Sequence, residues 1–224
     1  MLEKCSIIES NACQHRFLKH IATHSLSKDK LGTCLRQLYF ISQNFPFHIA
    51  ATISNSFDEE FLRVMADNLY VEAGGSKGVI HTELFRRLLR ALGQLDTRLA
   101  PEDVWPEVRE VERVCATHYR SSNFVEVLGA LYSFEELSSP MVQHWHDALK
   151  QIPTLAPRDY SFFTIHISIE QKHADDLEAL LTNRQFSREE IIQMQNASSA
   201  VLTAMEKMWD RFEAFAEITT AEPA

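Results

Sequence analysis

The segment from Phe162 to His173 combines metal-binding side chains with an apolar helical stripe. His166, Glu170 and His173 stand at positions i, i+4 and i+7, which lie within roughly 40° of one another around an α-helix. Apolar residues continue this column in both directions, namely Phe162, Phe163, Leu177 and Leu180. Burying three ionisable groups in such a stripe is costly unless something pairs them, and two imidazoles with a carboxylate suit Fe, Mn or Zn. We therefore predict a metal site here; the alternative is a solvated helix face with two ordinary histidines.

Further metal ligands are expected on the helices that face this segment. A carboxylate or imidazole stands on the apolar stripe of three other predicted helices, and these residues are Glu72, His81 and Glu135. Glu136 is turned about 100° away from the stripe that Glu135 continues, so it ranks second. Each of these residues, taken alone, is also compatible with a capping or boundary role. Together the six side chains are enough for two metal ions, and the charges of two Fe(II) ions and three carboxylates nearly cancel, which permits burial.

Helices must position these side chains, because the dominant period of the sequence is helical. S-x-x-E capping boxes that begin at Ser56 and Ser187 predict two helix starts. Pro46 is predicted to kink the second helix, and Pro140 is predicted to end the sixth. The predicted helices span about residues 2–24, 27–53, 56–72, 80–92, 107–119, 123–139, 141–150, 158–181 and 187–215.

The composition is that of a soluble globular protein, with 224 residues of which 45% are hydrophobic and 24% charged. No segment has the pattern of a strand, so we expect one all-α bundle over residues 1–216 and a disordered tail at 217–224. The formal net charge of −9 disfavours binding to nucleic acid or to an anionic membrane. No apolar run approaches the roughly 18 residues of a membrane span. Four scattered cysteines without zinc spacing, in a chain without the features of a signal peptide, indicate a reducing cytoplasm.

Five stretches of the chain resemble a known family in their order and spacing. They are Phe45-Pro46, Glu72-Ala73-Gly74-Gly75, His81-x-x-Leu84-Phe85, Leu131-Tyr132-Ser133-Phe134-Glu135 and His166-x-x-x-Glu170-x-x-His173-Ala174. The family is that of the haem-oxygenase-like di-iron oxidases and oxygenases, in the superfamily of the TenA-like and PqqC-like proteins and the branch of the death-domain-associating proteins. The resemblance covers roughly residues 10–215 and implies a single seven-helix bundle with a non-haem iron pair that activates O₂.

The resemblance also implies which side chains hold the irons. Carried over residue by residue, the metal ligands are Glu72, His81, Glu135, His166, Glu170 and His173. Many members have Asp where this chain has Glu170, whose longer arm would loosen one iron. The implied cofactors are two Fe(II) ions per chain, with Mn as the alternative metal, and O₂ as co-substrate.

Three departures from the family pattern bear on the reaction. The N-oxygenating members carry an extra carboxylate on the second helix, whereas residues 34–54 of this chain contain no acid and Gln43 is the nearest candidate. The members that form 4-aminobenzoate use tyrosines near the metal and a lysine after the Glu135 motif. This chain has Leu18 and Phe134 where two of those tyrosines would be, and no lysine between Glu135 and Trp145. Self-sacrificing 4-aminobenzoate synthesis is therefore disfavoured.

The predicted function is oxidation by a non-haem di-iron enzyme. The resemblance implies a peroxo di-iron(III) species, and the departures above favour C–H or C–C bond chemistry on an amino acid, aromatic ones included. The alternatives within the fold are a fatty-acid decarboxylase and an amine N-oxygenase. A thiaminase would need a cysteine on the helix of Glu135, and Cys115 lies on the preceding helix. A haem oxygenase would use a first-helix histidine (His15, His20 or His24) and leave the six-residue set without a role. A metal-free, partner-binding helical bundle is the remaining alternative.

The substrate pocket is expected beside the metals. The aromatic residues predicted to line it are Tyr39, Phe40, Phe45, Phe47 and Phe162, each of which is equally suited to core packing. Arg158 or Arg36 is predicted to hold a substrate carboxylate, although both also fit as surface charges. The expected partners are a small-molecule substrate (an amino acid or a fatty acid), an external electron donor and a second copy of the chain in a homodimer, with no nucleic acid and no membrane.

Overall fold

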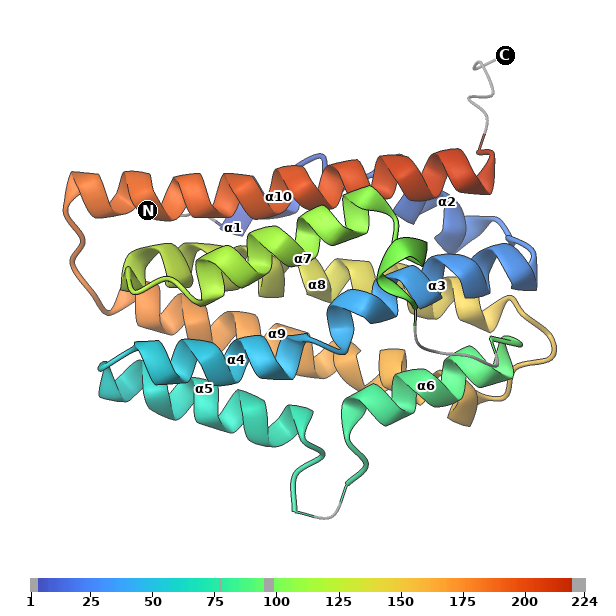
Figure 1. The fold of residues 1–224 in the computed structure, drawn as a ribbon, viewed down its shortest axis with the longest axis horizontal. Helices are drawn as coiled ribbons and strands as arrows, with labels where there is room; N and C mark the ends of the chain where they lie inside the picture. Colours follow the sequence, from blue (N-terminus) through green and yellow to red (C-terminus); the bar gives the residue numbers. More distant parts are fainter. Residues whose placement is uncertain (1–3, 77, 95–98, 219–224) are drawn as a thin grey trace.

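The computed structural model describes residues 4–76, 78–94 and 99–218, and every regular element in these ranges is helical (Figure 1). The all-α fold class predicted from the sequence is confirmed. The elements are α1 (Lys4–Ile8), α2 (Arg16–Thr23), α3 (Lys28–Ser42), α4 (Phe45–Asn55), α5 (Glu59–Glu72), α6 (His81–Ala91), η1 (Pro101–Asp103), α7 (Pro106–Tyr119), α8 (Phe124–Lys150), η2 (Pro157–Tyr160), α9 (Ser161–Thr182) and α10 (Arg188–Ala216). In these described ranges, ten α-helical segments stand where the resemblance implied seven helices.

Helix α8 is the central element of the bundle. It packs against α9 on one side and α10 on the other, and α2 and α7 cover more of its surface (Figure 1). Gly129 permits the close approach of α8 and α10, because a Cβ atom at this position would lie 2.4 Å from the Met194 carbonyl oxygen. Since α9 lies along α8, residues of these two helices can share one site.

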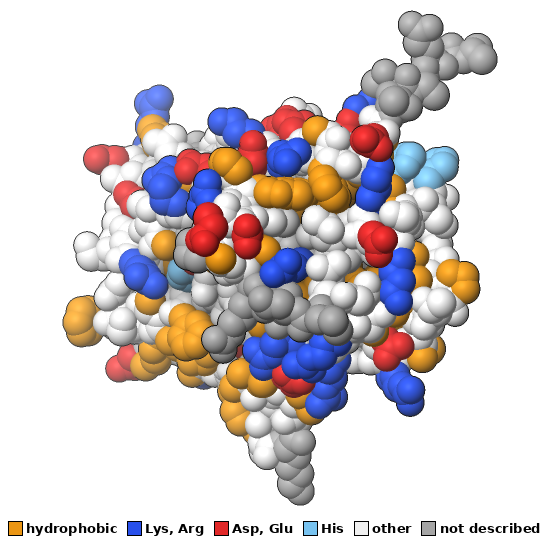
Figure 2. All heavy atoms as spheres, turned by 45° about the vertical axis from the view of Figure 1, so that its right-hand side comes forward, with side chains coloured by type: hydrophobic (Ala, Val, Ile, Leu, Met, Phe, Trp, Pro, Cys, Tyr) orange, Lys and Arg blue, Asp and Glu red, His pale blue; other side chains and the backbone are white. Residues whose placement is uncertain are grey.

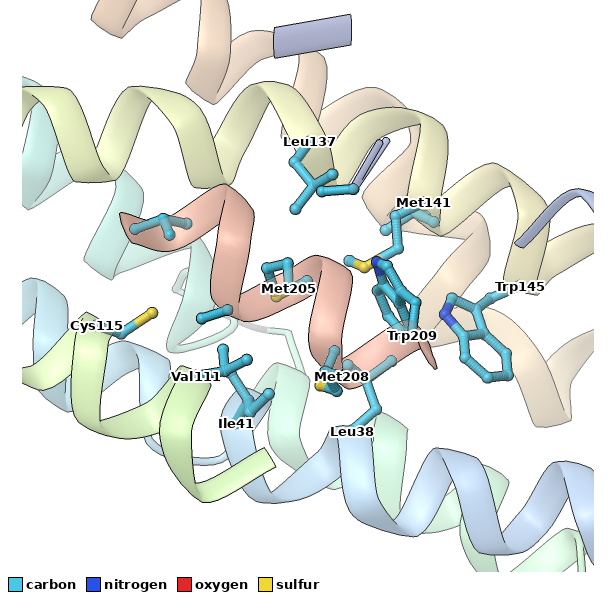
Figure 3. Packing of buried hydrophobic residues seen from close by; sticks show 14 of the residues in the cluster. Leu38, Ile41, Val111, Cys115, Leu137, Met141, Trp145, Met205, Met208 and Trp209 are labelled. Carbon is cyan, nitrogen blue, oxygen red and sulfur yellow. The ribbon is translucent and has the colours of Figure 1, made fainter. Parts of the chain in front are cut away.

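The apolar core fills the space between α3, α7, α8 and α10. Figure 3 shows side chains from all four helices pointing into it, among them Leu38, Ile41, Val111, Cys115, Leu137, Met141, Trp145, Met205, Met208 and Trp209. Burial of these side chains is the main force that holds the long helices together.

The two amino-terminal helices predicted from the sequence are each divided in the structure. Residues 2–24 were expected to form one helix, and the described part contains α1 and α2 with a turn between them. Residues 27–53 form α3 and α4, which are separated at Gln43 and Asn44. Pro46 lies in the first turn of α4. Backbone N–H groups in the first turn have no hydrogen-bond acceptor within the helix, so the lack of an N–H in proline costs nothing there. The proline therefore begins a new helix instead of kinking one.

The prediction that Pro140 ends a helix is wrong, because α8 continues from Phe124 through Pro140 to Lys150. A proline inside a helix costs about 3 kcal/mol. The residues just beyond it include Met141, Val142 and Trp145, all of which are buried. Burial of these large side chains offsets the lost hydrogen bond, so tertiary packing overrides the local signal.

The helix caps agree with the sequence in one of two cases. Ser187 caps α10 as predicted, since its side chain accepts from the Glu190 N–H and the Glu190 carboxylate accepts from the Ser187 N–H at 2.8 Å. Helix α5 is capped by Asp58 and not by Ser56, because the Asp58 carboxylate accepts from the Phe61 N–H at 2.8 Å. The predicted tail at 217–224 falls largely on residues 219–224, which lie outside the described residues. None of the helices in the described part of the chain is both long and apolar enough to cross a membrane.

A glycine turn joins α5 to α6. Gly74 has φ +89°, and a Cβ atom on it would lie 2.7 Å from the Val79 carbonyl carbon. Only glycine fits this position without strain. The turn folds the chain back so that Glu72, the last residue of α5, meets His81, the first residue of α6.

Candidate metal centre

The six side chains predicted as metal ligands lie together in two groups of three. Within each group, one ligand atom from every residue lies within 4.8 Å of the other two. The first group is Glu72, His81 and His166, and the second is Glu135, Glu170 and His173. Helix α9 contributes to both groups, α5 and α6 complete the first, and α8 completes the second. The sequence predicted the column on α9, and the packing of the bundle divides the column between two sites.

The first group is centred on the Glu72 carboxylate. Glu72 Oε1 lies 3.2 Å from His81 Nδ1 and 3.5 Å from His166 Nε2. The His81 and His166 rings are 4.7 Å apart between centroids, at an interplanar angle of 72°. All three residues are buried.

The second group is centred on His173. Its Nδ1 atom lies 3.6 Å from Glu135 Oε2 and 3.9 Å from Glu170 Oε2. Glu135 is fully buried, and the Glu170 side chain is 13% exposed. Two carboxylates and one imidazole therefore converge at a largely buried point.

Two neighbouring groups orient the candidate ligands. The His166 Nδ1–H donates to the Phe162 carbonyl oxygen at 2.6 Å, which leaves the Nε2 lone pair facing Glu72. Asn68 donates from Nδ2 to Glu135 Oε1 at 3.4 Å. Such outer contacts fix the tautomer and the direction of metal-binding side chains. The sequence reasoning missed Asn68, although its position four residues before Glu72 on one helix face was an available signal.

The electrostatics of the two groups differ. Burial raises the pKa of Glu72, but the adjoining His166 and His81 rings outweigh burial and bring the pKa to about 2. Burial raises the pKa of Glu170 well above its usual range, and repulsion from Glu135 and Glu72 raises it further. Burial lowers the pKa of His173, but the Glu135 carboxylate outweighs burial and the net shift is upward. A cation would relieve this crowding of carboxylates.

The donor set fits a metal ion. Among the described residues, three buried ligand atoms have no partner in hydrogen-bonding geometry: His81 Nδ1, Glu135 Oε2 and His173 Nδ1. Buried polar atoms in native proteins nearly always have partners, and the lone pairs of these three atoms could be satisfied by a metal cation, which accepts electron pairs. Imidazoles mixed with carboxylates suit Fe, Mn and Zn.

An apolar cavity adjoins both groups. It encloses about 640 Å³ of atom-free space, its opening to solvent included. Glu72 and His166 of the first group and Glu170 of the second form part of its wall. The remaining lining residues are Leu38, Ile41, Ser42, Phe45, Thr82, Phe134, Ser138, Met141, Val142, Phe162, Phe163 and Met205. No lysine or arginine occurs in this described lining.

The predicted pocket residues are only partly those that line this cavity. Phe45 and Phe162 do line it. Tyr39 is buried elsewhere, edge-on to Phe85 at 5.3 Å between ring centroids, because its face of α3 meets α6. Phe40 is partly buried against the core outside the cavity. Two further residues are on the surface, since Phe47 is 70% exposed and the Arg158 side chain is 89% exposed.

The residues considered for other chemistries serve the fold. Burial raises the pKa of the Cys115 thiol to about 12, so this thiol would be inert as a nucleophile. His15 caps α2 by accepting the Phe17 N–H at 3.1 Å, and its other ring nitrogen lies 3.2 Å from Asp210. This position is on the side of α2 that faces α10.

Comparison with known proteins places the chain among redox proteins. The model of a family described as iron-containing redox enzymes matches residues 33–205. A 4-aminobenzoate synthase of Chlamydia pneumoniae is 24% identical over 226 residues, which cover 100% of this chain and 96% of the relative. A 4-chloro-allylglycine synthase of Streptantibioticus cattleyicolor is 23% identical over 209 residues, which cover 91% of this chain and 78% of the relative.

Solved structures with little sequence identity share the fold. A CADD-like protein from Nostoc punctiforme superposes with a TM-score of 0.78 at 15% identity, over 95% of this chain and 94% of that one. A TenA homolog from Pseudomonas syringae pv. tomato gives 0.75 at 14% identity, over 94% and 90%. A domain from Shewanella denitrificans, described as having a heme oxygenase-like fold, gives 0.65 at 17% identity, over 99% and 93%. The fold that the sequence resemblance implied is therefore confirmed.

Proposed function

This chain belongs to the family of iron-containing redox enzymes, and from that premise we propose that it is a di-iron enzyme that uses O₂ to oxidise a C–H or C–C bond of an amino acid. The observation that carries the proposal is the apolar cavity whose wall includes Glu72, His166 and Glu170, members of both candidate metal groups. A substrate in this cavity would lie directly against the residues that hold the metals.

The six residues divide the work of holding iron. Glu72, His81 and His166 would bind one ion, and Glu135, Glu170 and His173 the other. Bound Fe(II) supplies electrons to O₂ and so provides the oxidant. The chain keeps the site rigid, because the Phe162 carbonyl oxygen holds His166 Nδ1–H and Asn68 holds Glu135. It also keeps bulk water out, since Glu135 and the three histidines are buried.

The cavity selects the substrate by its walls. Aromatic and aliphatic side chains such as Phe45, Phe134 and Met141 favour an apolar group of the substrate. The polar atoms away from the metals are the hydroxyls of Ser42, Thr82 and Ser138. These hydroxyls would orient the polar end of an amino acid. Arg158, which was predicted to hold the substrate carboxylate, is no longer proposed for this role, because its side chain is exposed to solvent.

Product analysis tests this proposal. The protein is loaded anaerobically with Fe(II), its iron is counted, and O₂ is admitted with a panel of amino acids and medium-chain fatty acids. We expect up to two irons per chain and an oxidised amino-acid product identified by mass. Consumption of a fatty acid in preference to the amino acids would favour the alternative function, a fatty-acid decarboxylase. A hydroxylamine or nitroso product alone would contradict the reaction type while leaving the metal site intact.

Neighbouring glutamates of α8 provide a matched control. Glu135→Gln should abolish O₂ consumption, because Glu135 belongs to the second group. Glu136→Gln should retain activity, because Glu136 faces a separate surface pocket with Pro140 and Ile167. Equal loss in both variants would show that a general disturbance of α8, and not a lost ligand, stops the reaction.

Formation of 4-aminobenzoate is the second candidate function. It is favoured by the similarity to a 4-aminobenzoate synthase, which extends over the whole chain. The cavity argues against a self-sacrificing route, because its described lining contains neither tyrosine nor lysine. Phe134 lines the cavity at a position where the family resemblance implies a tyrosine, and Leu18, at the second such position, is buried in the core. Modification of the protein's own side chains, with no added substrate consumed, would favour this second function.

A further inference from the structure

Helix α6 carries three arginines on a protein whose net charge is strongly negative. Arg86, Arg87 and Arg90 surround one acid, Glu83, with nitrogen–oxygen distances of 2.8, 3.6 and 3.1 Å. Their side chains are 32%, 51% and 50% exposed, so a partner can reach them. In Figure 2 the side of the molecule that carries α6 comes forward, and basic side chains gather there around an acidic one. We name the three arginines with Glu83 the arginine face.

The arginine face keeps a net positive charge. One carboxylate neutralises one of its three guanidinium groups. The adjacent element η2 packs against α6 and adds Arg158 and Asp159, whose charges cancel. The whole chain has a formal charge of −9, so the local positive charge of the arginine face contrasts with the charge of the molecule as a whole. Such a contrast orients an encounter and raises its rate.

A line of contacting rings leads from the arginine face to the first metal group. Arg86 Nη1 donates to the Tyr39 hydroxyl at 3.0 Å, and the Tyr39 ring lies 5.3 Å from that of Phe85. Phe85 stacks on Phe162 at 4.6 Å, and Phe162 lies 4.0 Å from the His166 ring. Tyr39, Phe85, Phe162 and His166 are all buried.

The two observations together define the kind of partner. Charge alone would suit any polyanion, but the ring contacts connect this surface to a redox site. Electron tunnelling weakens steeply with the gap between donor and acceptor, and rings in van der Waals contact shorten the gaps along the route. We infer that the arginine face is the docking surface for an acidic one-electron carrier protein that reduces the iron site.

The inference rests on the proposed di-iron function, and its chemistry is a simple electron transfer. The carrier's reduced centre loses one electron, and one iron of the site passes from Fe(III) to Fe(II). No bond forms or breaks, and two such transfers restore a pair of Fe(II) ions.

The first test measures docking without any metal. A reduced plant-type [2Fe–2S] ferredoxin, an acidic carrier, is titrated against the metal-free chain at several salt concentrations. We expect the affinity for ferredoxin to fall as the salt concentration rises. At low ionic strength, Arg90→Glu should lower this affinity by roughly tenfold. Arg113→Glu on α7 is the matched control, because Arg113 is also exposed and paired with a glutamate, Glu110 at 2.6 Å. It should change the affinity by no more than about twofold.

The second test measures reduction of the Fe(III)-loaded protein. Arg90→Glu should slow reduction by ferredoxin several-fold and leave reduction by dithionite, a small molecule, unchanged. Equal effects of Arg90→Glu and Arg113→Glu, or ferredoxin binding that ignores salt, would overturn the inference. A short oligonucleotide that displaces ferredoxin and binds more tightly would overturn it in favour of a polyanion site.

The outcomes separate this inference from the proposed function. Salt-dependent docking at Arg90, together with a chain that takes up no iron when Fe(II) is supplied anaerobically, would keep the docking surface and refute the di-iron function. Iron that dithionite reduces but no ferredoxin docking would keep the function and refute the docking surface.

Discussion

At the scale of single residues, Glu170 lies among other carboxylates with little access to water. Burial and the nearby Glu135 and Glu72 raise its pKa above the ordinary value of 4.5. A carboxyl group whose pKa is higher in the folded than in the unfolded chain lowers stability once the unfolded form has ionised. In the metal-free protein this loss begins as the pH rises through 4.5 and is complete above the raised pKa of the folded state. A bound cation would remove the repulsion, so the site is costly to the fold without its metal.

The substitution Glu170→Gln tests this conflict. A glutamine cannot ionise, so we expect the metal-free variant to be more stable than wild type at neutral pH, by roughly a few degrees in Tm. The difference should shrink as the pH falls toward 4.5. The variant should also lose the part of the Fe(II)-induced rise in Tm that comes from the second group. Calorimetry with and without metal measures both effects, and a metal-free variant less stable than wild type at pH 7 would contradict the account.

Asn68 is predicted to act through Glu135. Removing its amide in Asn68→Ala frees the Glu135 carboxylate to turn, and loss of such an outer contact typically weakens metal binding by about 10- to 100-fold. Glu135 shares its group with Glu170, which is expected to hold its iron more loosely. Only the weaker of the two binding steps in a Fe(II) or Mn(II) titration should therefore change. The control is Asn11→Ala, because Asn11 also donates to a glutamate, Glu206 at 2.9 Å, but on the surface. If both variants bind metal like wild type, Asn68 has no positioning role.

At the scale of elements, relations within one helix could be predicted and relations between helices could not. The period of the α-helix fixes His166, Glu170 and His173 on one face, and the structure agrees. Which candidate ligands share a group depends on how α5, α6 and α8 pack against α9. The distances between helices cannot be read from the sequence. Tyr39 and Phe47 lie outside the described cavity for the same reason, since an aromatic residue suits a pocket, a core or a surface equally well.

Local signals also failed where tertiary packing was stronger. Pro140 has the pattern of a helix end, yet the buried side chains beyond it keep α8 continuous. At Pro46 the break in the helix falls just before the proline, at Gln43 and Asn44. The sequence located a break correctly near Pro46 but not at Pro140, because the outcome depends on what the following residues can bury.

The turn between α5 and α6 gives a prediction with an internal control. Gly74 and Gly93 both have positive φ, at +89° and +91°. A Cβ atom on Gly74 would collide with the backbone at Val79, whereas one on Gly93 would meet nothing within 4 Å. Gly93→Ala should therefore cost only backbone strain, about 1–2 kcal/mol. Gly74→Ala should cost more, and it should also weaken the first metal group by moving His81 away from Glu72.

Thermal unfolding and metal titration of the two alanine variants check this prediction. Metal affinity should fall in Gly74→Ala and stay at the wild-type level in Gly93→Ala. Equal effects of both substitutions on metal affinity would show that the turn does not set the distance between Glu72 and His81.

At the scale of the whole molecule, the bundle has a firmly packed part and a part that a metal would tie to it. Helices α8 and α10 share the core that Figure 3 shows, with Trp145 and Trp209 fully buried. Helices α5 and α6 lie at the lower side of the bundle (Figure 1), and their ends meet α9 through Glu72, His81 and His166. An ion held by these three residues would link three helices at one point.

Metal removal should therefore loosen the molecule unevenly. Segments that open most easily are those with the fewest buried contacts, and an ion that binds only the folded state stabilises whatever it ties down. We expect a chelator to speed amide hydrogen exchange in α5 and α6 by roughly tenfold or more, while exchange in the middle of α10 changes little. His166→Ala, which removes the α9 member of the first group, should exchange like the metal-free wild type whether or not Fe(II) is present. Mass spectrometry of peptides from residues 59–72, 81–91 and 194–209 measures all three segments. Protection spread evenly over the three peptides would mean that the metal acts on global stability alone, and no change in any of them would favour a bundle that holds no metal.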